Sequence, residues 1–100
     1  MRNVIWQPKA LADFDAQIAF IAEKSPQGAS LVADRIEAAV NLLAANAIGR
    51  PGRVPGTYEF FVPRTSHFIA YAFVPNSDAL SILRIVHSAR DWQEGQWPKD

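Results

Sequence analysis

The stretch AIGRPGRVPG, residues 47–56, constrains the fold most because it divides the chain into two halves with different periodicity. Its prolines and glycines cannot continue a helix, and its arginines favour contact with solvent. The half before it repeats apolar residues at a helical spacing, whereas the half after it is rich in aromatic and β-branched residues. The sequence therefore predicts an α+β fold in which helices precede most of the strands.

A short strand and two amphipathic helices are predicted before this loop. The strand runs from Asn3 to Trp6 and is ended by proline. The first helix starts near Pro8 and has an apolar stripe at helical spacing, formed by Leu11, Phe14, Ile18 and Ile21. Ser25 and Pro26 end it and start a second helix that reaches about Asn46, because serine is a favoured N-cap and proline suits the first helical position. So short a connection predicts an antiparallel helical hairpin.

Three strands are predicted after the loop, at residues 57–62, 67–74 and 79–86. The turn sequences PRTS and PNSD separate them, which indicates an antiparallel arrangement. The middle strand is apolar on both of its alternating faces. We expect the helical hairpin to cover one face of the sheet, while the other face is covered as well or awaits a partner.

Length and composition limit the class of protein. One hundred residues, 49% of them hydrophobic, predict a single domain over residues 1–100. The chain has no cysteine, so stability must come from packing and a thiolate site is excluded. The N-terminal sequence lacks the pattern of a signal peptide, and polar residues interrupt every apolar run, so we expect a cytoplasmic protein without a membrane partner. A formal net charge of zero argues against direct binding of free nucleic acid.

His87 and Arg90 carry the most chemistry near the end of the last predicted strand. A histidine can move protons near neutral pH, and an arginine three residues on can bind a phosphate. Together they could cut RNA, or they could bind an acidic partner. A histidine hydrogen-bonded at a strand end, beside an Arg90–Asp91 ion pair, is the more common arrangement. The residues alone leave these interpretations open.

Metal and cofactor sites are not expected. His67, His87 and Asp91 lack the spacing of metal ligands, and neither a glycine-rich nucleotide-binding loop nor a serine-hydrolase motif occurs. His67 starts a strand beside a turn and is expected to face solvent. Asp13 and Asp15 cannot share a helix face and are likewise expected on a solvated surface.

Three local patterns together resemble one protein family. They are WQPKALADF with the following IAFIAEKSPQGA, the loop-to-strand stretch GRPGRVPGTYEFFV, and the ending ILRIVHSARDW. In this combination the sequence resembles the RelE/ParE toxin superfamily, the toxic half of bacterial type II toxin–antitoxin modules. The resemblance implies an α+β fold with a short N-terminal strand and an antiparallel helical hairpin packed on an antiparallel β-sheet. It also implies a cognate antitoxin that wraps the toxin.

The superfamily has two mechanistic branches, and the resemblance favours the ParE-like one. RelE-like members cut mRNA on the ribosome with basic residues on the central strands and an arginine after the last strand. At the matching positions this chain has Glu59, Phe61 and Phe68, and only Arg90 matches. A glutamate and two phenylalanines cannot stabilise an anionic transition state. ParE-like members poison DNA gyrase, and GTYEFFVPRTS and HSARDW resemble that branch.

The sequence therefore predicts a toxin that inhibits DNA gyrase by protein contact and has no chemistry of its own. Arginine and large aromatic residues often anchor interfaces. Contacts to the target or the antitoxin are expected from Arg64, Tyr71, Arg84, Arg90 and Trp92. One alternative is a ribosome-dependent endoribonuclease in which His87 and Arg90 are catalytic. Another is a weakly toxic relative that only binds its antitoxin.

Overall fold

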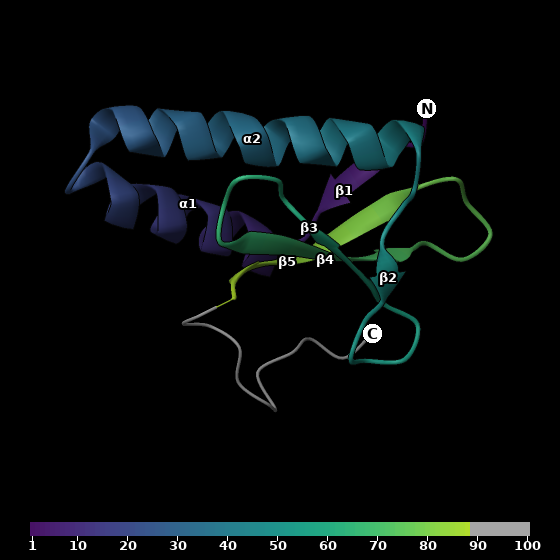
Figure 1. Ribbon diagram of the computed structural model, residues 1–100. Coiled ribbons are helices and arrows are strands. Elements are labelled where there is room, and N and C mark those ends of the chain that lie inside the picture. Colours follow the sequence, from purple (N-terminus) through teal and green to yellow (C-terminus); the bar gives the residue numbers. More distant parts are fainter. Residues whose placement is uncertain (89–100) are drawn as a thin grey trace.

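The computed structural model describes residues 1–88, which fold as two helices on one face of a five-stranded sheet (Figure 1). In chain order the elements are β1 (Val4–Trp6), α1 (Pro8–Ala22), α2 (Pro26–Ala45), β2 (Arg50–Pro51), β3 (Tyr58–Phe61), β4 (His67–Phe73) and β5 (Leu80–His87). The strands lie in the order β1-β5-β4-β3-β2. The predicted α+β class, with a helical hairpin on a sheet, is confirmed.

The helical hairpin follows from its cap residues. Each helix begins with a proline, whose missing N–H would have no intrahelical partner at that position. The side chain of Ser25 accepts the N–H of Gly28 at 2.9 Å, so the second helix starts within a few residues of the end of the first. The two helices therefore lie side by side on the same face of the sheet (Figure 1).

The sheet is mixed. Strands β3, β4 and β5 form the predicted antiparallel arrangement, in which Tyr58 faces Tyr71 and Ile69 faces Ile85. Strand β1 adds to β5 in parallel. Strand β2 pairs with β3 and lies within the stretch predicted as a loop, because two residues can pair where the prolines and glycines around them prevent a longer strand.

The core lies between the hairpin and the sheet. It joins the inward residues of the strands to apolar residues of α1 and α2, among them Ala10, Ile36, Val40, Leu43, Ile69, Tyr71, Leu80, Ile82 and Ile85. On the opposite face of β4, Phe68 and Ala70 are buried too, which accounts for the two-sided apolar pattern of this strand. Within residues 1–88, neither helix has the length and hydrophobicity that crossing a membrane requires.

Candidate functional site

A pocket of about 510 Å³ hollows the face of the sheet opposite the helices. Tyr58 and Phe60 pack against the core, so Glu59 and Phe61, which alternate with them along β3, point to the opposite face. The walls come from β3, β4, the segment around β2 and the residue after β5: Arg50, Pro51, Gly52, Arg53, Glu59, Phe61, Phe68 and Ser88. The pocket thus brings guanidinium groups, a carboxylate and aromatic rings to one place.

The segment around β2 can form one wall because it approaches β3 very closely at Gly49. This residue has a φ of 135°, and a Cβ atom there would lie 2.7 Å from the carbonyl oxygen of Glu59. Only glycine fits such a position. The next two residues, Arg50 and Pro51, then pair with Glu59 and Tyr58. Because facing residues of an antiparallel pair lie close together, this register places Arg50 beside Glu59.

Arg50, Glu59 and Phe61 form a partly open cluster at this pocket. Arg50 Nη2 lies 3.9 Å from Glu59 Oε1, and the two side chains are 68% and 7% exposed. Glu59 Oε2 also accepts the backbone N–H of Arg53 at 3.1 Å. The Arg50 guanidinium lies over the ring of Phe61, 5.5 Å from its centroid, and Phe61 is 47% exposed. A cation and an aromatic ring therefore face solvent above a buried carboxylate.

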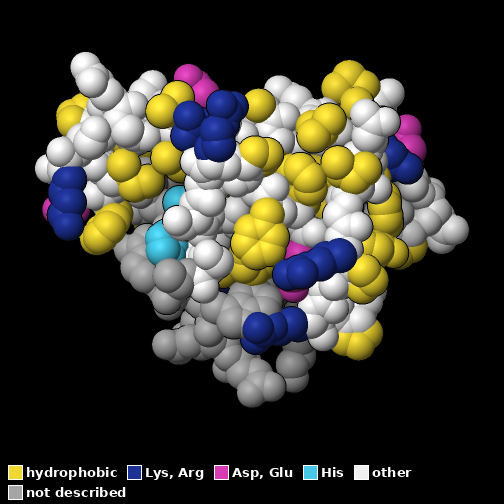
Figure 2. Space-filling model, viewed as in Figure 1, with side chains coloured by type: hydrophobic (Ala, Val, Ile, Leu, Met, Phe, Trp, Pro, Cys, Tyr) yellow, Lys and Arg dark blue, Asp and Glu magenta, His cyan; other side chains and the backbone are white. Residues whose placement is uncertain are grey.

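On the face that Figure 2 shows, the cationic side chains of the described residues do not merge into one patch. In Figure 2 the Lys and Arg side chains (dark blue) stand apart on the face in view, separated by hydrophobic and other groups. Proteins that hold a nucleic-acid backbone by charge present a basic patch or stripe. This face therefore resembles a protein-contact surface more than a phosphate-binding one.

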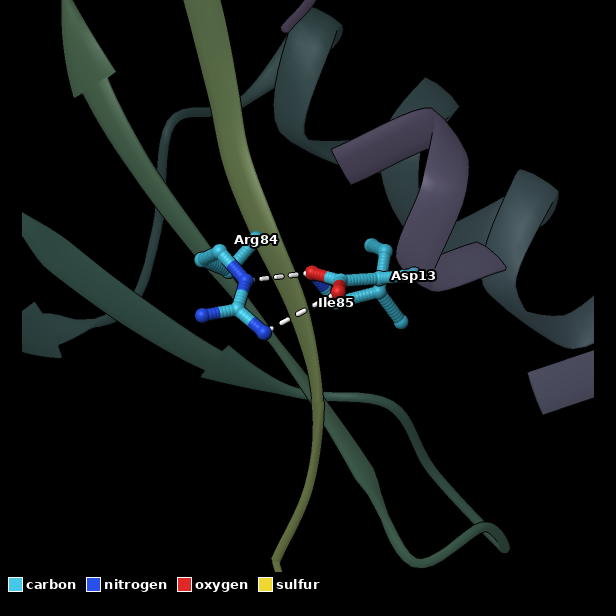
Figure 3. A network of polar contacts seen from close by, with 3 residues as sticks. All are labelled: Asp13, Arg84 and Ile85. Carbon is cyan, nitrogen blue, oxygen red and sulfur yellow. Dashed lines mark hydrogen bonds and ion pairs between the residues drawn. The ribbon is translucent and has the colours of Figure 1, made fainter. Parts of the chain in front are cut away.

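A second arginine–carboxylate pair fastens α1 to β5 (Figure 3). Arg84 Nε and Nη2 donate to Asp13 Oδ2 and Oδ1 at 2.5 and 3.0 Å, and the N–H of Ile85 donates to Oδ2 at 3.1 Å. Strand β1 pairs with β5 only over residues 80–82, so Asp13 takes an edge N–H beyond the end of β1. We name this group, Asp13, Arg84 and the N–H of Ile85, the Asp13 latch.

The Asp13 latch bears on two expectations from the sequence. The prediction that Asp13 faces solvent is wrong, because α1 carries its carboxylate against the edge of β5. Arg84 is buried and its guanidinium is held by Asp13, and its predicted contact with a target or partner stays a prediction. The described conformation therefore gives Arg84 a structural contact.

Two histidines meet at the end of the central strands. The prediction that His67 faces solvent is wrong: the side chain is buried, and its Nε2 lies 3.2 Å from Oε1 of Gln17 on α1. Its ring contacts that of His87 edge to face, with centroids 5.1 Å apart. A polar partner inside the fold explains the burial of His67. Among residues 1–88, no three side chains of the metal-binding types come together.

Tyr71 also lies inside the fold. Its hydroxyl donates to the carbonyl of Ile48 at 2.5 Å, and its ring stacks on Tyr58 with centroids 5.5 Å apart. Burial, and then the neighbouring Tyr58 phenol, raise the pKa of Tyr71, while Arg2 acts in the opposite direction. Tyr71 therefore anchors the segment before β2, and its predicted contact with a target or partner stays a prediction.

The predicted contact residues do not form one surface in the part of the chain that is described. Arg64 is exposed on the turn between β3 and β4, where its carbonyl accepts Nη1 of Arg35 at 3.0 Å, and it does not line the pocket. Arg90 and Trp92 lie outside the described residues. The sequence prediction missed the cluster of Arg50, Glu59 and Phe61. The sequence did contain a signal for this cluster: Glu59 and Phe61 alternate along one strand that follows a glycine-rich stretch containing arginines.

Comparisons with known proteins give one consistent result. The family model described as the ParE toxin of the type II toxin–antitoxin system parDE matches residues 4–92. A curated protein of Sinorhizobium fredii named "Putative toxin Y4kP" is 32% identical over 94 residues, which cover 93% of this chain and 95% of that protein. A solved structure described as the chromosomal ParDE TA system from P. aeruginosa matches with a TM-score of 0.76 and 28% identity, covering 87% of this chain and 96% of that one.

Proposed function

The chain belongs to the ParE toxin family of type II toxin–antitoxin systems, and from this premise we propose that it inhibits DNA gyrase by protein contact. Its fold is the RelE/ParE-like α+β fold. In this proposal the toxin acts in the cytoplasm, where gyrase works, and a cognate antitoxin neutralises it. Arg90 and Trp92 remain proposed contact residues of the tail.

One observation carries the choice of gyrase over mRNA. The positions at which the RelE-like branch has cations are occupied by Glu59, Phe61 and Phe68, and these three side chains line the same pocket. The carboxylate of Glu59 lies near Arg50 and accepts a hydrogen bond from the Arg53 backbone. At these positions a carboxylate and two phenyl rings offer no stabilisation to the negative charge that develops during RNA cleavage, where cations would. Contact with a protein needs no such charge stabilisation.

The proposed antitoxin has an apolar surface available on the helical hairpin. Four of its large apolar side chains are exposed: Leu11, Phe20, Leu31 and Leu42. Leu11 lines a groove of about 330 Å³, together with Trp6, Phe14, Glu37, Val40 and Asn41. Exposed apolar residues next to a groove are typical of protein-binding sites. The similar solved structure is described as a ParDE toxin–antitoxin system, which supports an antitoxin partner for this chain.

The test uses purified toxin and reconstituted gyrase. We expect micromolar toxin to inhibit supercoiling and to raise the amount of cleaved plasmid DNA, and we expect stoichiometric antitoxin to reverse both effects. A toxin–antitoxin complex prepared before mixing serves as the control. Unchanged supercoiling and unchanged cleavage at micromolar toxin would rule out the gyrase proposal.

A ribosome-dependent endoribonuclease is the second candidate, because Arg50 and Arg53 bring two cations to the pocket. In that case His87 would move protons and Arg90 would stabilise charge. Primer extension on mRNA after induction of the toxin tests it. Discrete cuts that disappear in both His87→Ala and Arg90→Ala would favour this candidate over the gyrase proposal.

A further inference from the structure

We propose that the pocket opposite the helices is the docking site for the toxin's target, and that it receives a short protein segment with a carboxylate next to an apolar side chain. This inference rests on the proposed function, since the target in question is gyrase. The segment's carboxylate would bind Arg50, and its apolar side chain would pack on Phe61.

The Arg50 guanidinium can bind a second carboxylate at little cost. It is mostly exposed, and its 3.9 Å separation from Glu59 is at the outer limit of an ion pair. A pair this far apart, with its cation mostly in water, contributes about 0–1 kcal/mol. The buried Glu59 carboxylate keeps the N–H of Arg53, so turning the guanidinium toward a partner loses little. Its position over Phe61 keeps the cation beside an apolar surface. Arginine and aromatic residues in such a position are typical anchors of protein interfaces.

The floor of the pocket selects a peptide over a nucleic acid. Glu59 is buried there, and its carboxylate is fixed by the N–H of Arg53 at 3.1 Å. A phosphate backbone carries one charge at every nucleotide, so binding one phosphate at Arg50 would bring further negative charges near Glu59. A peptide can present a single carboxylate with an uncharged neighbour. A volume of about 510 Å³ suits a few side chains of such a segment.

The character of the two exposed surfaces assigns the pocket to the target. Long-lived complexes bury apolar surface, whereas transient contacts are more polar. The helical hairpin presents exposed leucines and a phenylalanine, which suits the antitoxin. The pocket has an exposed cation at its edge and a buried carboxylate in its floor, which suits a contact that must form and dissociate.

The chain offers a matched control for the pair of Arg50 and Phe61. Arg2 lies over Phe73, 5.3 Å from the ring centroid, and Phe73 is 41% exposed. Neither of these two residues lines the pocket. Arg2→Glu therefore makes the same change in charge beside a similar ring elsewhere on the surface.

The experiment compares Arg50→Glu, Phe61→Ala and Arg2→Glu in three measurements: inhibition of reconstituted gyrase, affinity for the antitoxin, and thermal unfolding. We expect Arg50→Glu and Phe61→Ala each to raise the inhibitory concentration about tenfold or more, which is the loss expected at an interface anchor. Arg2→Glu should inhibit as the wild type does. All three variants should bind the antitoxin with nearly wild-type affinity. Phe61 is half exposed, so Phe61→Ala should fold. It therefore still tests the pocket if Arg50→Glu fails to fold.

Each failure has a separate signature. A wild-type toxin that leaves gyrase unaffected overturns the proposed function, and the target docking site with it. A wild-type toxin that inhibits gyrase, together with pocket variants that inhibit equally well, overturns only the docking site. Loss of antitoxin affinity with full gyrase inhibition would assign the pocket to the antitoxin. If the wild-type toxin binds a DNA duplex in the absence of gyrase and Arg50→Glu does not, the pocket would be assigned to nucleic acid. Assignment of the pocket to the antitoxin or to nucleic acid would overturn the proposal.

Discussion

Two arginine–carboxylate pairs lie on the same sheet and differ in almost every physical respect. Arg84 and Asp13 are 10% and 13% exposed, lie 2.5 Å apart at their closest atoms and share two hydrogen bonds. Arg50 and Glu59 lie 3.9 Å apart, and the Arg50 side chain is 68% exposed. The first pair joins a helix to a strand, whereas the second joins neighbouring strands at the edge of a pocket.

The difference shows that geometry, and not residue type, decides what an arginine does in this protein. A buried bidentate pair is costly to break, because the remaining charge has lost both its partner and its water. An exposed pair at the limit of contact exchanges its partner for water at little cost. The Asp13 latch therefore belongs to the fold, and Arg50 is available for a contact.

Breaking the Asp13 latch should give the largest effect. Asp13→Ala leaves the Arg84 guanidinium buried without its carboxylate and removes the acceptor of the Ile85 N–H. We expect the free energy of unfolding to fall by about 3–5 kcal/mol, the usual cost of removing one partner of a buried pair. Urea unfolding followed by circular dichroism measures it.

Asp15→Ala is the matched control for the Asp13 latch, because Asp15 is on the same helix and is exposed. It should change the free energy of unfolding by no more than about 0.5 kcal/mol. Equal effects of Asp13→Ala and Asp15→Ala would show that the latch does not hold α1 to the sheet.

Gly49→Ala should have the next largest effect on stability. It tests how firmly the segment that carries Arg50 is fixed against β3. The positive φ and the 2.7 Å approach of a Cβ atom to the Glu59 carbonyl both oppose any side chain at this position. We expect a loss of about 1–3 kcal/mol in the free energy of unfolding, from strained backbone alone. Ile48→Ala, an exposed neighbour, should cost less. If Gly49→Ala is as stable as the wild type, the segment around β2 is not fixed against β3.

The sequence was sufficient for the elements of the fold because each has a local physical cause. Pro8, Ser25 and Pro26 set the helix starts, and the observed helices and strands lie close to the predicted ranges. Two features depended on distant residues and were not predicted. The parallel pairing of β1 with β5 joins opposite ends of the chain, and β2 exists only because β3 offers it a partner.

The candidate site was harder to predict, because burial and pairing across the fold decide the role of each polar residue. Asp13 and Arg84 are 71 residues apart in sequence, and His67 meets Gln17 across 50 residues. Their residue types alone suggested surface positions. These polar residues thus make structural contacts inside the fold, whereas Arg50 and Phe61 gained their exposed positions from the pairing of β2 with β3.

Tyr71→Phe should have a smaller effect on stability than Gly49→Ala. It tests whether the Tyr71 hydroxyl also holds the segment before β2 in place. The variant loses the hydrogen bond from the hydroxyl to the Ile48 carbonyl and keeps the ring. One hydrogen bond contributes about 0.5–1.5 kcal/mol, so the free energy of unfolding should fall by that amount at neutral pH. A fully stable Tyr71→Phe would mean that the hydroxyl does not anchor this segment.

The contribution of Tyr71 should depend on pH in the alkaline range. Its pKa is raised above the ordinary tyrosine value of 10.0, chiefly by burial, so the folded state holds the phenol proton more tightly than the unfolded state does. This stabilisation is fully present below pH 10.0, the ordinary pKa of tyrosine, and is lost as the pH rises through the raised pKa of Tyr71. The difference between wild type and Tyr71→Phe in urea unfolding should therefore shrink above about pH 10. A constant difference would contradict this.

Arg50→Ala should have the smallest effect on stability and so separates the two arginine–carboxylate pairs most clearly. The pair with Glu59 is loose and its cation is exposed, so it contributes about 0–1 kcal/mol, and the N–H of Arg53 still satisfies the Glu59 carboxylate. The free energy of unfolding should therefore stay within about 1 kcal/mol of wild type, while Arg84→Ala should lose several times more. Urea unfolding of both variants in parallel measures the contrast. Equal losses would mean that Arg50 is a structural residue like Arg84, and a surface contact through Arg50 would lose its physical basis.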